Sequence, residues 1–205
     1  MMKGIALLLT IVILLTGQRA DAAKCKYALE SVDPTTNALT VQTKWNALTS
    51  SWLRNFRLYE AHISVKSEGG DTRLFMKIGY YKETTDEPSS KSLQDFFVFP
   101  EYGALLIRMS DGTFTELPAI GEVRKNAWAI APEDQDRDTD KYSTVASAVV
   151  AYALNESAMQ ALTAQPATKF TMTTAGDPVE VEIHKKSFGD FVNDVGCIIE
   201  AEGTR

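Results

Sequence analysis

The sequence predicts an α+β fold that is mainly antiparallel β, arranged as a sandwich or a strongly bent sheet, with two short helices in the C-terminal part. Two observations lead to this prediction. Many short segments alternate apolar and polar residues with the period of two that is typical of strands, and several neighbouring segments are separated by turns rich in Gly and Asp. Apolar residues at helical spacing are clearest after residue 155, where they form two short stretches.

The first 22 residues have the organisation of a secretory signal sequence. Lys3 supplies a positive charge, residues 4–16 are apolar but too short to span a bilayer, and Ala20, Asp21 and Ala22 form a small-residue cleavage site. We therefore expect a periplasmic or secreted protein in which residues 23–205 form one domain without a membrane span. A retained membrane anchor is the alternative.

Charge and cysteine content narrow the possible functions further. The chain has a formal net charge of −6, which argues against binding to nucleic acid or anionic membranes. It has two cysteines, Cys25 and Cys197, so an oxidising compartment allows one intramolecular pairing. We expect a disulfide between them that ties the two ends of the domain together; two buried or unpaired thiols are the alternative.

The first half of the mature chain contains strand candidates and one clear hairpin. Alternation over residues 39–45 predicts a strand that buries Trp45, following a shorter strand at 26–32. Residues 59–66 and 74–80 alternate on either side of Gly69 and Gly70, which predicts a hairpin whose loop is longer than two residues. Residues 47–56 are ambiguous, and residues 83–95 form a polar loop.

The middle of the chain continues this pattern with shorter strands. Residues 96–99 and 127–131 are short apolar strand candidates. Residues 104–109 and 114–117 flank Asp111 and Gly112, a turn signal that predicts a second hairpin.

The C-terminal unit reads strand, helix, hairpin, helix. Residues 142–154 suit a buried strand, with an Ala-rich helix as the alternative, and Asn155 is placed to cap a helix that Pro166 ends. Residues 167–175 and 179–184 form a third hairpin. In the last helix, Ser187 and Asp190 resemble a capping box, and the apolar stripe is Phe188, Phe191, Val192 and Val195. Gly196 is placed as a helix C-cap, so we expect Cys197 just beyond the helix.

Three sets of residues are candidate functional groups. Alternation puts His62 beside Glu60 and Ser64, and His184 beside Glu180 and Glu182, on polar strand faces where a His–carboxylate pair serves acid–base or metal chemistry. Carboxylates at every second position of an acidic loop suit a calcium ion if the loop curls, although the spacing lacks the Gly and Glu of an EF-hand. Exposed tryptophans suit a binding platform. The loop and platform candidates are Asp134, Asp136, Asp138 and Asp140, and Trp52 and Trp128.

Some segments also resemble known proteins. Residues 33–36 (DPTT) with 43–45 (TKW) look like the D-x-x-T…T-x-W opening of uncharacterised secreted bacterial proteins, in which residues 105–112 and the final helix–hairpin–helix recur in similar order. The last unit is also similar to the C-terminal part of the invasion-associated locus B family of periplasmic envelope proteins, whose central paired cysteines are absent here. The resemblance implies a β-rich bacterial envelope protein and carries over no catalytic residue.

We therefore expect a non-catalytic accessory protein that binds another protein or an envelope component and uses no cofactor. A small-molecule- or calcium-binding module is one alternative, and an enzyme that uses His62 or His184 is another. A concave pocket containing a histidine would favour the enzyme, whereas a flat apolar patch would favour a protein partner.

Overall fold

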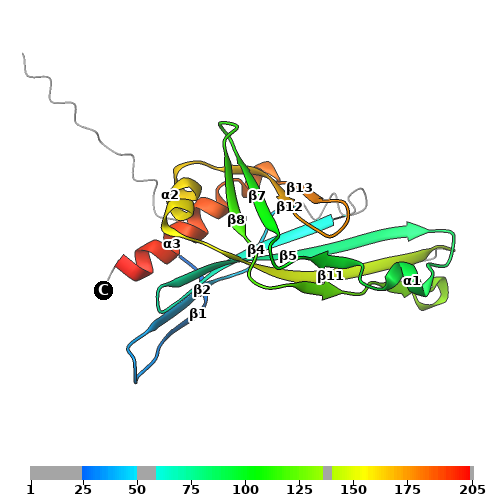
Figure 1. The fold of residues 1–205 in the computed structure, drawn as a ribbon, viewed down its shortest axis with the longest axis horizontal. Coiled ribbons are helices and arrows are strands. Elements are labelled where there is room, and N and C mark those ends of the chain that lie inside the picture. Colours follow the sequence, from blue (N-terminus) through cyan, green and yellow to red (C-terminus); the bar gives the residue numbers. More distant parts are fainter. Residues whose placement is uncertain (1–24, 50–58, 136–139, 204–205) are drawn as a thin grey trace, which may run out of the picture.

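The computed structural model describes residues 25–49, 59–135 and 140–203, and their fold is α+β and mainly antiparallel β, as predicted (Figure 1). The largest sheet has seven strands, and β3 (Asn46–Ala47) joins it by pairing with β4. The other six follow one another in the order β1 (Tyr27–Val32), β2 (Leu39–Thr43), β4 (Tyr59–Glu68), β5 (Asp71–Thr84), β11 (Tyr142–Ala153) and β10 (Trp128–Ile130).

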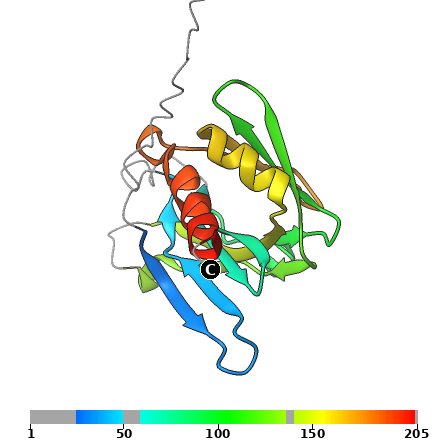
Figure 2. The same ribbon diagram turned by 90° about the vertical axis from the view of Figure 1, so that its left-hand side faces the viewer.

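Two smaller sheets complete the β structure. A two-stranded sheet pairs β6 (Phe97–Phe99) with β9 (Val123–Lys125), and a four-stranded sheet contains the second and third predicted hairpins. The order of its strands is β13 (Val179–Glu182), β12 (Ala167–Met172), β7 (Ala104–Met109) and β8 (Phe114–Pro118). Helices α2 (Glu156–Ala164) and α3 (Asp190–Gly203) lie side by side above the seven-stranded sheet (Figure 2).

One hydrophobic core joins these layers. It contains the inward-facing residues of the long strands, such as Ile63, Met76 and Val150, together with residues of the four-stranded sheet and of both helices. The rings of Phe170 on β12 and Phe191 on α3 lie 5.1 Å apart, which links the smaller sheet to the last helix.

The central hairpin is tighter than predicted. Glu68 pairs directly with Asp71, so the loop contains two residues, Gly69 and Gly70, and the prediction of a longer loop was wrong. Their φ angles are +59° and +89°. A two-residue turn with both φ values positive matches the twist of the strands, and glycine adopts it without steric strain.

The first two helices agree with the prediction only in part. Helix α1 (Ser90–Leu93) lies inside the expected polar loop, and the side chain of Ser89 caps it by accepting from the Ser92 amide at 3.2 Å. The cap of α2 is as predicted, because Asn155 Oδ1 accepts from the Ala158 amide at 2.8 Å.

Helix α3 continues through Gly196, so the prediction that Cys197 lies beyond the helix was wrong. A glycine in a helix interior costs only about 1 kcal/mol, which the buried Phe191, Val195 and Ile198 offset by packing into the core. The predicted capping box is also absent. Helix α3 begins at Asp190, whereas Ser187 ends the short helix η3 (Lys185–Ser187) and its hydroxyl donates to the Ala47 carbonyl at 2.8 Å.

Trp45 is a further correction. Strand β2 ends at Thr43, before the alternation reaches Trp45, and the chain then turns into β3. The Trp45 side chain is consequently 41% exposed rather than part of the core.

Candidate functional site

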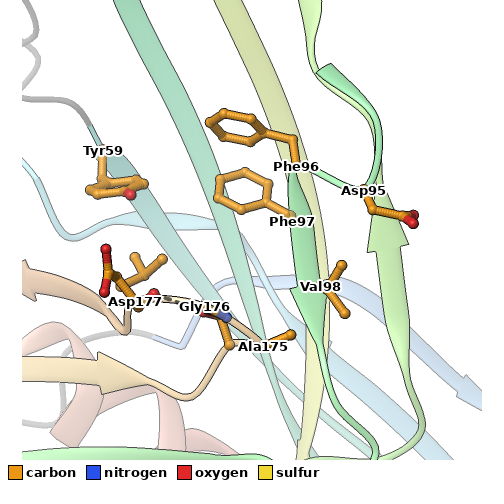
Figure 3. A pocket seen from close by; sticks show the side chains of 10 residues that line it. Tyr59, Asp95, Phe96, Phe97, Val98, Ala175, Gly176 and Asp177 are labelled. Carbon is orange, nitrogen blue, oxygen red and sulfur yellow. Dashed lines mark hydrogen bonds between the residues drawn. The ribbon is translucent and has the colours of Figure 1, made fainter. Parts of the chain in front are cut away.

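A cavity of about 380 Å³ lies between the start of β4, strand β6 and the β12–β13 turn (Figure 3). Three aromatic side chains, Tyr59, Phe96 and Phe97, form one part of its wall. The turn between β12 and β13 supplies the opposite part. The remaining lining residues are Asp95, Val98, Thr174, Ala175, Gly176, Asp177 and Val179.

The aromatic wall belongs to a closed circuit of four rings. Tyr59 contacts Tyr80 with ring centroids 5.4 Å apart, Tyr80 contacts Phe96 at 4.7 Å, and Phe96 contacts Phe97 at 5.2 Å. Phe97 closes the circuit with Tyr59 at 6.4 Å. Phe97 is buried and the other three rings are half-buried, so the cluster is held by the core but keeps a face toward the cavity.

A strained residue directs two of these rings. Asp95 has a φ of +46°, in the left-handed region that residues other than glycine rarely adopt. Its amide donates to Asn126 Oδ1 at 3.0 Å, which holds the bend between α1 and β6. Because the chain reverses here, Phe96 and Phe97 both reach the aromatic cluster, although neighbours in a regular strand point to opposite faces.

The β12–β13 turn is fixed against β6 by its backbone. The Ala175 amide donates to the Val98 carbonyl at 2.8 Å. The Thr174 hydroxyl donates to the Asp177 carbonyl at 2.7 Å and accepts from the Gly176 amide at 3.1 Å. These bonds give the cavity a wall that exists without a ligand.

The two carboxylates of the lining have different surroundings. Asp95 Oδ2 lies 3.6 Å from Arg124 Nη1, and its side chain points away from Tyr59 (Figure 3). The carboxyl group of Asp177 points toward Tyr59, and no basic side chain of the described ranges forms an ion pair with it. Burial raises the pKa of Tyr59, and the negative charge of Asp177 raises it further, so this hydroxyl stays protonated at neutral pH.

Neither histidine lines the cavity. His62 Nε2 lies 3.2 Å from Glu60 Oε1 on the outer face of β4, as the alternation predicted. Strand β13 ends at Glu182, so the expected placement of His184 on its face was wrong: His184 precedes η3, and its Nδ1 accepts from the Lys186 amide at 3.4 Å.

The acidic loop and the tryptophans are only partly described. Asp134 ends the short helix η2 (Pro132–Asp134) and Asp140 precedes β11, whereas Asp136, Asp138 and Trp52 lie outside the described residues. Within the described ranges, no group of His, Cys, Asp and Glu is arranged to hold a metal ion. Trp128 lies on β10 and is 58% exposed.

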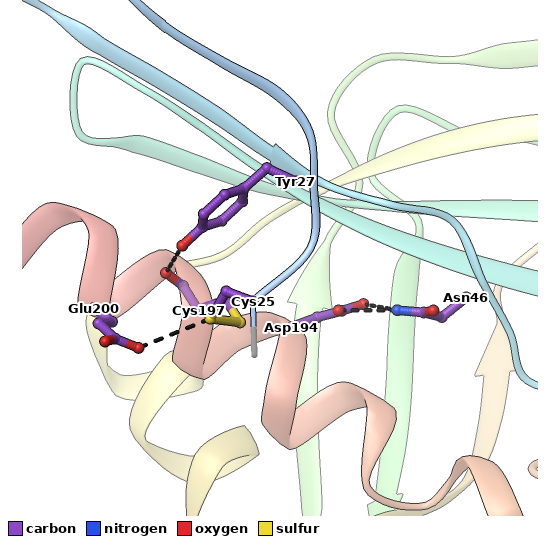
Figure 4. The surroundings of a disulfide bond; sticks show 6 residues. All are labelled: Cys25, Tyr27, Asn46, Asp194, Cys197 and Glu200. Atoms are coloured by element: carbon purple, nitrogen blue, oxygen red, sulfur yellow. Dashed lines mark hydrogen bonds between the residues drawn. A yellow bond between two sulfur atoms is a disulfide. The ribbon is translucent and has the colours of Figure 1, made fainter. Parts of the chain in front are cut away.

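The disulfide is present as predicted. Cys25 and Cys197 are bonded with Cα atoms 5.6 Å apart, and the Tyr27 hydroxyl donates to the Cys197 carbonyl at 3.0 Å (Figure 4). One helical turn earlier, Asp194 is buried against Asn46, whose Nδ2 donates to both carboxylate oxygens at 2.9 Å. The bond and this contact together attach α3 to the first strands.

No protein-family model, curated protein or solved structure matches the chain. The resemblance to the locus B family and to other secreted bacterial proteins therefore stays a prediction. No helix of the described residues has the length and apolar character needed to cross a membrane.

The cavity was not predicted from the sequence. The adjacent Phe96 and Phe97 could have indicated an irregular backbone at this point, because the alternation of a regular strand cannot bury two neighbouring rings in one core. The other lining residues come from distant segments, and no local pattern brings them together.

Proposed function

We propose that the protein is a non-catalytic binding protein of an extracytoplasmic compartment and that the cavity holds its ligand. The observation that supports this most is the half-buried aromatic wall facing the anchored β12–β13 turn. Small-molecule sites are typically concave, largely apolar and preformed, with a few polar groups and volumes of roughly 300–1,000 Å³. The cavity is concave, its lining is about equally polar and apolar, and its volume lies at the lower end of this range.

The chemistry of the lining favours binding over catalysis. Its described residues include no imidazole, thiol or amine, and the hydroxyl of Thr174 is engaged within the turn. Asp177 suits recognition of a ligand, because its carboxyl group is exposed and points toward Tyr59, whereas Asp95 is paired with Arg124 and points away.

Export is the part of the proposal that rests on the sequence. The disulfide suits an oxidising compartment, and the first 22 residues have the pattern of a cleaved signal. N-terminal sequencing of the protein purified from its producing cell should begin at Ala23. An intact Met1 would contradict export by cleavage.

A protein partner on the outer face of the large sheet is the second candidate. Trp128 pairs with Val145, which pairs with Tyr81, so the three side chains share this face. Val149 lies on the same face and is 43% exposed. An exposed indole beside aliphatic side chains is typical of an interaction surface.

Two variants separate these candidates. Gly176 lines the cavity, and a Cβ there would meet no atom within 4 Å, so Gly176→Phe should narrow the cavity while the fold is kept. Trp128→Ser removes the exposed indole. Each disulfide-intact protein is equilibrated with an envelope extract and repurified, and the retained ligand is identified by native mass spectrometry.

We expect the wild type and Trp128→Ser to retain a ligand that Gly176→Phe loses. Equal retention by all three proteins would contradict a ligand in the cavity. Loss in Trp128→Ser alone would favour the protein-partner candidate.

A further inference from the structure

We propose that the cavity binds an alkylammonium group, between the rings of Tyr59, Phe96 and Phe97 and the carboxylate of Asp177. This inference rests on the proposed function and specifies the class of ligand. The group is carried by small amines and by the lysine side chain, and both sources offer the same positive head on an apolar stem.

The aromatic wall supplies the first part of the recognition. The face of an aromatic ring carries negative charge density and attracts a cation within about 6 Å of its centroid. Tyr59 and Phe96 line the cavity and are half-buried, so their rings can contact a cation there, and the buried Phe97 packs against both of them. The ring circuit through Tyr80 fixes their positions before any ligand arrives.

Asp177 supplies the second part. Its carboxyl group faces Tyr59 across the cavity (Figure 3), and within the described ranges it has no ion-pair partner. Asp95, the other carboxylate of the lining, is already paired with Arg124 and points away. Among the described residues, the cavity thus has one carboxylate without an ion pair opposite an aromatic wall, and a bound cation would interact with the carboxylate and with the rings.

The shape of the wall favours a compact head over a planar one. The planes of Tyr59 and Phe97 differ by 34°, and those of Phe96 and Phe97 by 71°. A tetrahedral ammonium can contact several rings at such angles, whereas a planar guanidinium stacks on one ring at a time. The net charge of −6 also attracts cations and repels anions at long range.

The test compares choline with 3,3-dimethylbutan-1-ol, which has the same shape without the charge. Binding is measured by calorimetry and by shifts of the Gly176 and Asp177 amide resonances in the full exported protein. Three variants are used: Asp177→Asn, Phe96→Leu and, as the matched control, Asp95→Asn. N-acetyl-lysine methylamide replaces choline in a parallel series to distinguish the two sources of the ammonium group.

We expect choline to bind about fivefold or more tightly than its uncharged analogue. Asp177→Asn and Phe96→Leu should each weaken choline binding by about fivefold, and Asp95→Asn should change it by less than about twofold. Tighter binding of the lysine derivative than of choline would support the proposal and assign the group to a peptide side chain. The reverse order would support it and assign the group to a small amine.

Equal binding of choline and its uncharged analogue, unchanged in Asp177→Asn, would overturn the ammonium assignment. A ligand that the wild type retains and Gly176→Phe loses would then still support the proposed function. No shift of either amide with any of the three probes at roughly 10 mM would also overturn the assignment.

Discussion

The carboxyl group of Asp194 is buried, and its protonation is coupled to folding. Its side chain is 6% exposed, and burial is the main cause that raises its pKa from 3.8 to about 7. The hydrogen bonds from Asn46 oppose this shift, and the charge of Asp190 adds to it. The native state therefore holds a proton on Asp194 over a pH range where the unfolded chain has lost it.

The sign of the pH dependence follows from this raised pKa. The contribution of Asp194 to stability is greatest below its unfolded pKa of 3.8 and decreases as the pH rises to its folded value of about 7. The full difference is at most about 4 kcal/mol. We predict that Asp194→Asn, compared with wild type, gains relative stability between pH 5 and pH 8 in urea unfolding.

Asp111 provides a control, because its pKa is shifted in the opposite direction from that of Asp194. Its exposed carboxylate accepts hydrogen bonds from the Thr113 hydroxyl and amide and from Gln165, which lower its pKa. Its stabilising contribution is lost as the pH falls below about 4, so Asp111→Asn should leave the profile between pH 5 and pH 8 unchanged. A flat difference between wild type and Asp194→Asn over that range would contradict a raised pKa at Asp194.

Among the elements, the β4–β5 hairpin depends on the backbone of its two-residue turn. Gly70 has a φ of +89°, which an L residue adopts only with strain. We predict that Gly70→Ala lowers the free energy of unfolding by about 1–2 kcal/mol, measured by urea unfolding. Gly176→Ala is the matched control, since its φ is not in the positive range and its Cβ meets no atom. Equal stability of the two variants would contradict the role of the turn.

Helix α3 depends on its disulfide. Closing a loop with a sequence separation of 172 residues stabilises the fold by at most roughly 5 kcal/mol through the entropy of the unfolded chain. We predict that Cys25→Ala with Cys197→Ala lowers the free energy of unfolding and speeds hydrogen exchange in β1 and α3 more than in β4 and β5. Uniform acceleration in all four elements would show that the bond does not act mainly on the chain ends.

Elements with a local signal were predictable from the sequence, and those fixed by packing were less so. The three hairpins were predicted because their strands alternate and are joined by turn residues. The N-cap of α2 was predicted because Asn155 is a residue type typical of that position. The end of α3 was missed because Gly196 is a common terminating residue, whereas the packing of Ile198 carries the helix past it. The burial of Trp45 was mispredicted because its strand ends two residues earlier.

For the whole molecule, the cavity lay beyond sequence reasoning because it exists only after three sheets have packed. Tyr59 comes from the large sheet, Phe97 from the two-stranded sheet and Val179 from the four-stranded sheet. No spacing along the chain encodes their proximity. The polar part of the site is equally non-local, since Asp177 faces Tyr59, which lies far from it in the sequence.

The calcium hypothesis also concerns the whole molecule and stays a prediction. If Asp134, Asp136, Asp138 and Asp140 bind calcium, the ion should raise the melting temperature by mass action, because it binds the native state. Thermal melts of the exported protein with millimolar calcium and with a chelator give the shift, and Asp136→Asn should reduce it. An unchanged melting temperature in the wild type would leave the loop as a solvated acidic segment.

The disulfide also orders events in time. In a chain that crosses a membrane from its N-terminus, Cys25 reaches the oxidising side 172 residues before Cys197. During that interval its thiol can pair only with other molecules, such as an oxidase or a second copy of the chain. If the chain is exported as proposed, the intramolecular bond therefore closes only when translocation is nearly complete, and a product cut short before residue 197 keeps an unpaired thiol at Cys25.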